Sequence, residues 1–225
     1  MTDDIAVVRH PRARRTRLSF DPVSGQARLT LPPRASLAKA LAWARAQEAW
    51  IDHQRDRLPA ARPFVPGATI PVDGQLLTIA WHADALRTPA VEGDRLVLGG
   101  LLESVPHRVE RWLRRQALAL LEQDTAFYAA RAGVSVSGVT IGDARGRWGS
   151  CANHGAIRYS WRLVLAPPAV RRATAAHEVA HRVHMNHAPV FHALVAELYG
   201  RDPRPERAWL RANGAALHWY GRSPG

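Results

Sequence analysis

The sequence predicts an α+β protein in which a β-rich N-terminal part precedes a helix-rich C-terminal part. Residues 1–100 hold short apolar segments separated by turn signals, of which Asp73-Gly74 is one. The region 101–225 begins with a helical pattern at 105–132 and ends with further helical segments. Strands grouped apart from helices are typical of α+β proteins. We therefore expect an N-terminal β-rich region with one helix at 1–100 and a second region at 101–225.

The composition is typical of a folded soluble protein. The chain has 225 residues, of which 47% are hydrophobic and 22% charged. No apolar run reaches the length of a transmembrane helix, so we expect no membrane association. The first residues do not resemble a signal peptide. Cys151 is the only cysteine, which excludes an intrachain disulfide, and together these features predict a cytoplasmic protein.

The net charge of +12 raises the possibility of a nucleic-acid partner. Five arginines lie between Arg9 and Arg17, where they could form a patch for nucleic acid or an acidic partner. A solvated strand face is the simpler explanation, and we prefer it. Lys39 is the only lysine among 31 basic residues, a bias that genome composition can produce. Nucleic acid therefore stays an alternative partner, and the sequence gives no oligomeric state.

The N-terminal region is expected to contain two groups of strands around one helix. Residues 5–31 predict a hairpin or meander with a turn at 21–25. Ser36 is a suitable N-cap for a helix that runs to about Arg57. Short strands are then expected within 68–98.

The C-terminal region is expected to be mainly helical. The helix at 105–132 ends at Gly133, a residue suited to a C-cap. Residues 157–165 give the strongest alternation of apolar and polar residues in the chain and predict a strand. Three helices should follow, at about 168–184, 190–199 and 205–220.

The expected helix at 168–184 contains an H-E-x-x-H motif formed by His177, Glu178 and His181. Positions i and i+4 share one face of a helix, so both imidazoles can reach one metal ion. Glu178 lies beside them as a general base for a metal-activated water.

A hydrolytic zinc site needs a third protein ligand and an open position for water. His184 is unsuitable, because seven residues of helix separate it from His177, roughly 10.5 Å of axial rise. His187 follows a break in the helix and can approach from outside its axis, so we prefer it. Glu197 on the next helix is the second choice and His192 the third. The predicted site therefore holds one zinc ion on His177, His181 and His187.

Several segments resemble the YgjP-like family of predicted metal-dependent hydrolases, relatives of the SprT-like zinc metallopeptidases. The segments that carry the resemblance are 147–151, 155–168, 177–181 and 185–191, and the likeness extends over nearly the whole chain. Two positions depart from the family pattern. His192 stands where such proteins commonly have tryptophan, and His184 is also unusual.

The resemblance implies a zincin-like catalytic part with a small antiparallel sheet packed on the motif helix. It assigns the metal ligands to His177, His181 and His187 and the catalytic acid to Glu178. In related peptidases the strand before the zinc helix is a sheet edge that pairs with an extended substrate, a place that residues 156–165 would fill.

We therefore expect a zinc-dependent hydrolase, most simply a metalloendopeptidase acting on a peptide or protein. The alternative is a nucleic-acid-associated protein, in which the metal site is structural or the protease is recruited to DNA or RNA. The oxyanion-stabilising residue is not identifiable from sequence. Tyr159, His218, Tyr220 and several arginines are candidates.

Overall fold

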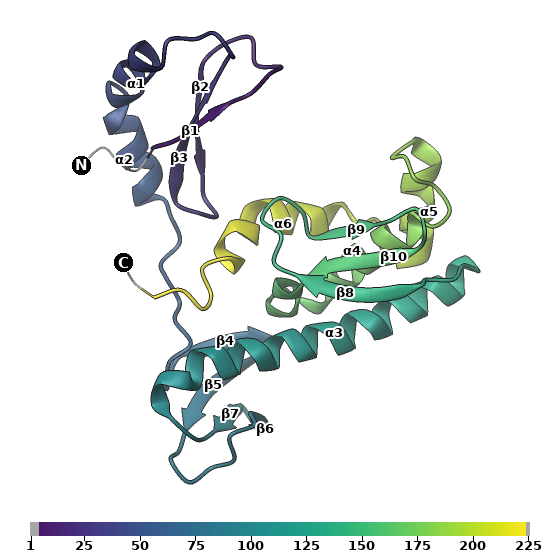
Figure 1. Ribbon diagram of the computed structural model, residues 1–225. Coiled ribbons are helices and arrows are strands. Elements are labelled where there is room, and N and C mark those ends of the chain that lie inside the picture. The colour runs from purple at the N-terminus through teal and green to yellow at the C-terminus, as the bar shows by residue number, and fades with distance from the viewer. Residues whose placement is uncertain (1–4, 224–225) are drawn as a thin grey trace. The chain divides into compact units, whose positions relative to one another are not determined.

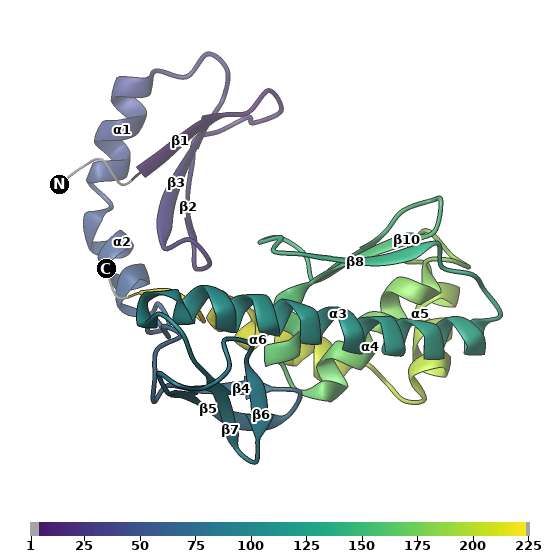
Figure 2. The ribbon, with the colours of Figure 1, turned by 60° about the horizontal axis from the view of Figure 1, so that its bottom comes forward.

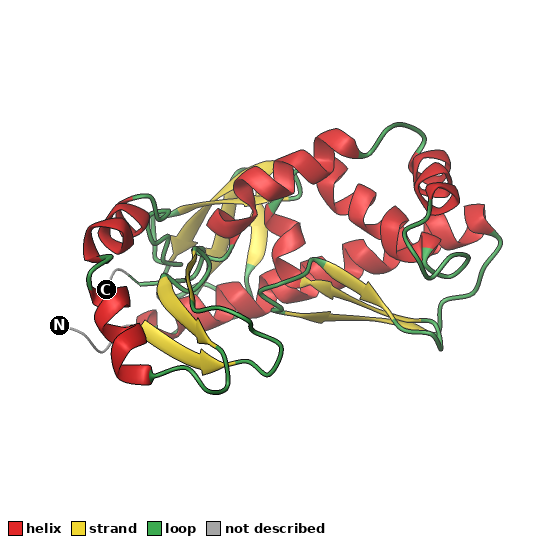
Figure 3. Ribbon diagram, turned by 90° about the horizontal axis from the view of Figure 1, so that it is seen from above, coloured by secondary structure: helices red, strands yellow, loops and turns green. Residues whose placement is uncertain are grey.

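A computed structural model describes residues 5–223, and the predicted α+β class is confirmed. Helices and three separate small sheets make up these described residues (Figure 3). The chain divides into two compact units, Met1–Ala60 and Ala61–Gly225. Within the described residues, no helix is both long and apolar enough to cross a membrane.

The N-terminal unit is a three-stranded sheet with two helices (Figure 1). Its elements are β1 (Ile5–Arg9), β2 (Arg17–Asp21), β3 (Gln26–Leu31), α1 (Leu37–Arg45) and α2 (Glu48–Asp56). The order is β1-β3-β2, with β1 parallel and β2 antiparallel to β3, so the segment is not a simple meander. β3 is the central strand, and its residues Leu29 and Leu31 are fully buried against Ala40 and Ala44 of α1. Ser36 caps α1 as expected, but the predicted single helix is two helices.

The second unit begins with a four-stranded sheet. It contains β4 (Thr69–Val72), β5 (Gln75–Trp81), β6 (Ala90–Glu92) and β7 (Arg95–Leu98), in the order β4-β5-β7-β6. Asp73 and Gly74 form the tight β4–β5 turn with φ of 49° and 83°, which suits this dipeptide. The apolar face of the sheet belongs to the same core as the C-terminal helices. The compact unit thus starts at Ala61 rather than near residue 100, the boundary that strand content suggested.

The helix α3 (Val105–Ala132) is the longest element and matches its predicted limits. It buries Val109, Leu113 and Leu121 along one face, and Gly133 ends it in the left-handed conformation with φ of 64°. In Figures 1 and 2 the β4–β7 sheet lies on one side of α3 and the sheet of β8–β10, described next, on the other. α3 also packs against α4 (Pro168–Ala180), the helix that carries the metal-binding motif.

A three-stranded sheet precedes α4 and contains β8 (Gly138–Gly142), β9 (Gly149–Cys151) and β10 (Ala156–Ser160). A small sheet beside the motif helix was expected, but it is mixed rather than antiparallel, because β10 pairs parallel with β8 and antiparallel with β9. β10 is the central strand, so the expectation that residues 156–165 form a sheet edge is wrong. The edge strand in contact with α4 is β9.

The strand predicted at 157–165 ends at Ser160, and Trp161–Leu165 form the 3-10 helix η2. Alternation in sequence suggested one buried and one exposed face. In β10 the polar residue Arg158 is exposed, but in η2 residues of both sets are buried, including Arg162. The Arg162 guanidinium pairs with Asp143 and donates to the carbonyl oxygens of Leu217 and Tyr220. These bonds satisfy its charge in the interior, so the residue need not face solvent.

Two more helices complete the unit, α5 (Pro189–Tyr199) and α6 (Arg204–Leu217). Both pack against α4. α5 begins after a turn in which the Ala188 amide donates to the side chain of Asn186. That turn reverses the chain just after α4 and carries His187 back toward the motif.

Candidate metal centre

The motif lies at the C-terminal end of α4, which ends at Ala180 rather than at 184. Small residues, among them Ala173, Ala176 and Ala180, are buried and let neighbouring elements approach the helix closely. His181 is the C-cap residue and still has helical dihedral angles, so it stays one turn above His177 on the same face.

The structure brings together the three histidines that the sequence selected. Ring nitrogens of His177, His181 and His187 all lie within 4.8 Å of one another. The Nε2 atoms of His177 and His187 are 3.2 Å apart. Two nitrogens on a tetrahedral zinc ion, each about 2.0–2.1 Å from it, are separated by roughly 3.3 Å, so this spacing fits a shared ion. Glu197 and His192, the alternative third ligands, lie outside this group of described residues.

His184 takes part through its backbone rather than its side chain. Its carbonyl oxygen lies 3.1 Å from Nδ1 of His181. Such a bond places the proton on Nδ1 and leaves Nε2 free for a metal, the arrangement usual for histidine ligands. It arises because the chain tightens after Ala180, whose carbonyl accepts from both Val183 and His184. The sequence pattern points only to the imidazole of His184, because a backbone contact of this kind leaves no mark on residue type.

Phe191 of α5 contacts all three imidazoles and orients them. It is fully buried, and its ring centroid lies 4.9, 4.5 and 4.8 Å from those of His177, His181 and His187. Rotation of any of these imidazoles is therefore restricted by an apolar neighbour. This role of Phe191 was not predicted from the sequence. Its position four residues after His187, in the first turn of the next helix, is the signal that the sequence offers.

Burial favours the neutral, metal-binding form of His177 and His181. It lowers the pKa of His177 to about 4, with further contributions from His181 and His187. Burial also lowers the pKa of His181. Three imidazole nitrogens that converge on one point fit a divalent ion such as zinc.

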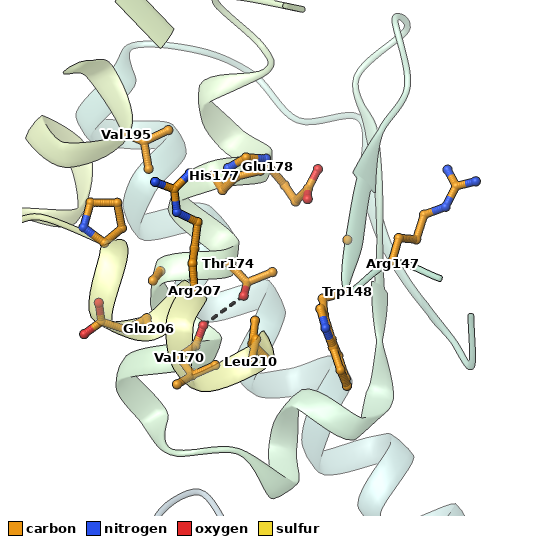
Figure 4. A pocket seen from close by; sticks show the side chains of 13 residues that line it. Arg147, Trp148, Val170, Thr174, His177, Glu178, Val195, Glu206, Arg207 and Leu210 are labelled. Carbon is orange, nitrogen blue, oxygen red and sulfur yellow. Dashed lines mark hydrogen bonds between the residues drawn. The ribbon is translucent and has the colours of Figure 1, made fainter. Parts of the chain in front are cut away.

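Glu178 is buried beside this cluster and points toward β9 (Figure 4). Burial raises the pKa of its carboxyl to about 7, and the charge of Arg147 acts in the opposite direction. Its side chain lies against the backbone of Gly149, where an added Cβ would be 2.5 Å from Oε1. Any residue larger than glycine at 149 would therefore displace the carboxylate. Gly149 belongs to the segment 147–151 that carries the family resemblance, and this contact explains why a glycine stands there.

A cavity of about 250 Å³ opens next to His177 and Glu178. It lies between β9 with its preceding loop on one side and α4, α5 and α6 on the other (Figure 4). Its side-chain lining is as follows: Arg147, Trp148, Val170, Ala173, Thr174, His177, Glu178, Val195, Pro203, Glu206, Arg207 and Leu210. The cavity is large enough for one substrate side chain, and it touches one metal-ligand candidate and the base candidate directly.

The tyrosines and histidine considered as oxyanion partners are engaged elsewhere. The Tyr159 hydroxyl is buried and shares a hydrogen bond of 2.9 Å with Thr125 of α3, and burial raises its pKa. The Tyr220 hydroxyl accepts from Arg62. His218 is buried 3.9 Å from Asp143. Among these candidates, only arginines line the cavity, namely Arg147 and Arg207.

Comparison with known proteins agrees with this arrangement. The family model described as YgjP-like, metallopeptidase domain matches residues 14–213. Searches of curated proteins and of solved structures gave no match. The match covers most of both compact units and includes the whole histidine cluster, Glu178 and Gly149. By this match, the chain belongs to the YgjP-like metallopeptidase family.

Proposed function

We propose that this protein is a zinc-dependent endopeptidase in which His177, His181 and His187 hold the ion and Glu178 is the general base. The observation that carries the proposal is the convergence of three imidazoles, one of which, His177, lines the same cavity as the buried carboxylate of Glu178. When bound, a zinc ion on three protein ligands supplies Lewis acidity, lowers the pKa of a water molecule and leaves a position open for substrate.

Glu178 is suited to move a proton in both directions. A carboxyl whose pKa is near 7 can accept a proton from the attacking water and then donate it to the leaving amine at neutral pH. Gly149 allows the carboxylate to lie tightly against β9, which limits its rotation. The base would therefore be held in place before substrate arrives.

The strand β9 is the natural place for an extended substrate to pair. Among the described residues, β9 pairs only with β10, so its other edge remains open. Main-chain pairing with such an edge gives affinity with little dependence on sequence, and side-chain pockets then provide selectivity. Pairing along β9 would place the peptide beside Glu178, because Gly149 contacts that side chain.

The proposal is tested by replacing Glu178 with Gln, an uncharged side chain of the same shape. Wild-type protein loaded with zinc is incubated with a mixed peptide library, and cleavage products are identified by mass spectrometry. We expect the Glu178→Gln variant to bind zinc as wild type does while cleavage falls by about 100-fold or more. Wild-type rates in the variant would exclude Glu178 as the base, and absence of cleavage by the wild type would overturn the proposed peptidase activity.

A second candidate function, nucleic-acid binding, is favoured by one basic concavity at the start of α3. A cavity of about 350 Å³ is lined there by Arg87, His107, Arg108, Arg111 and Arg115, with no acidic side chain in its lining. Binding of labelled DNA or RNA that weakens steeply with salt would support it. Replacing Arg111 and Arg115 by Ala should then weaken binding more than replacing Arg14 and Arg15. Equal effects would assign binding to overall charge, and no binding at low salt would exclude this function.

A further inference from the structure

One arginine in the cavity beside Glu178 lacks a partner of its own. Arg207 lies on α6, and its Nε atom is buried without a hydrogen bond. Nearby, Arg201 pairs with Glu206 and Arg204 pairs with Asp202. Within residues 5–223, Arg207 makes no comparable ion pair. A half-buried guanidinium without a carboxylate is unusual, because partial removal of a charge from water has a cost that a partner normally offsets.

Figure 4 shows the direction of this side chain. The Arg207 guanidinium extends toward His177, while the carboxylate of Glu206 points away from it. Oε1 of Glu206 already accepts hydrogen bonds from Tyr199 and Arg201. The positive charge of Arg207 is therefore presented to the space next to the metal-binding cluster rather than used to hold α6 in place.

Apart from Arg147, His177, Glu178 and Glu206, whose Oε2 atom is buried without a hydrogen bond, the rest of the cavity is mainly apolar. Its walls include Val170, Ala173, Val195 and Leu210, with the indole of Trp148 on the β9 side. The hydroxyl of Thr174 donates to the carbonyl oxygen of Val170 at 2.9 Å, so its hydrogen is already used. A ligand with a short apolar stem fits these walls, and a negatively charged end fits at the guanidinium of Arg207, from which the Glu206 carboxylate points away.

We propose that the cavity receives the substrate residue adjacent to the scissile bond and that Arg207 binds a carboxylate on that residue. The inference rests on the proposed peptidase function. A guanidinium binds a carboxylate through two parallel hydrogen bonds, which fixes the position of the substrate as well as its charge. The carboxylate can belong to an acidic side chain or to the C-terminus of the substrate, and the two sources share this chemistry.

Binding can be measured without turnover by using the Glu178→Gln protein loaded with zinc. Three short ligands separate the sources of the carboxylate: acetyl-Gly-Glu-amide has only the side-chain group, acetyl-Gly-Gln has only the terminal group, and acetyl-Gly-Gln-amide has neither. Calorimetry should show one of the first two ligands binding about 10- to 100-fold more tightly than the third, the range expected for hydrogen bonds to a charged group. The tighter ligand identifies the source. Equal or undetectable binding of all three would overturn the inference.

Variants then assign the preference to Arg207. Arg207→Ala should remove the difference between the ligands, and Arg207→Lys should restore part of it. Arg211→Ala is the matched control, because Arg211 lies one turn further along α6, is exposed and does not line the cavity. A preference that survives in Arg207→Ala would also overturn the inference. Absence of peptide cleavage by the wild type would instead refute the proposed function. The two outcomes are distinguishable, because the ligand-binding comparison does not depend on turnover.

Discussion

The backbone of Gly149 lies against the side chain of Glu178, so that an added Cβ would be 2.5 Å from Oε1 and 2.6 Å from Cγ. These distances are far below a normal contact between non-bonded atoms, and Glu178 is buried on its other sides. The glycine is needed here for space. It lets the edge strand β9 approach the helix closely enough to enclose the carboxylate.

Gly149→Ala should therefore impair catalysis while metal binding is retained. The methyl group would push the carboxylate from its position, and a displacement of about 1 Å can lower a rate about 100-fold. Zinc content and the rate of peptide cleavage are the two measurements. Gly146→Ala is the matched control, because a Cβ there meets no atom within 4 Å. Equal activity of the two variants would show that Glu178 tolerates the displacement.

Single substitutions should distinguish the predicted zinc ligand His187 from its neighbours His184 and His192, which are not expected to bind the ion. His187→Ala removes a predicted ligand and should weaken zinc binding by more than about 100-fold, beyond the loss typical of an outer-shell change. His184→Ala should have little effect, because the contact to His181 comes from the backbone carbonyl. Competition with a chromogenic chelator measures the affinities. Retention of wild-type affinity in His187→Ala, or its loss in His192→Ala, would contradict the assignment.

Local patterns predicted the site better than they predicted the arrangement around it. His177 and His181 follow from helix periodicity alone, and His187 from the need for a ligand beyond a chain reversal. The central position of β10 could not be read in the same way, because strand order depends on pairing between distant segments. The burial of Arg162 could not be predicted from the sequence either. Its partners Asp143 and Leu217 are remote in sequence, so its charge suggested an exposed face.

Arg171 joins three elements of the second unit, and its loss should destabilise the fold. Its buried guanidinium contacts Asp124 of α3 at 2.7 Å and also Asp73 in the β4–β5 turn. Arg171→Met should lower the free energy of unfolding by about 3–5 kcal/mol, because it leaves the carboxylate of Asp124 partly buried and without this partner. Arg172→Met is the control. Its side chain is 50% exposed and 4.0 Å from Asp124, so we expect less than about 1 kcal/mol. Urea unfolding measures both, and similar losses would refute the assigned role.

His218 should make the folded state sensitive to acid. Burial and then the charge of Arg162 lower the pKa of its imidazole to about 4, and Asp143, 3.9 Å away, offsets only part of this effect. Arg145 and Arg222 also act against the charged form. The unfolded chain, with a histidine pKa near 6.5, therefore takes up a proton more readily than the folded protein between about pH 6.5 and 4. Stability from neutral His218 is complete above this window and decreases as the pH falls through it.

The size of this effect can be isolated with a His218→Gln variant. A shift from about 6.5 to about 4 corresponds to on the order of 3 kcal/mol, most of it lost by pH 4.5. Urea unfolding of both proteins at pH 7.5 and 4.5, with a chelator present throughout, gives the change in unfolding free energy. His177 and His181 titrate in both proteins, so their contribution cancels in the comparison. The wild type should lose about 2–3 kcal/mol more than the variant between the two pH values. Equal losses would mean that His218 is protonated in the folded protein as readily as in the unfolded chain.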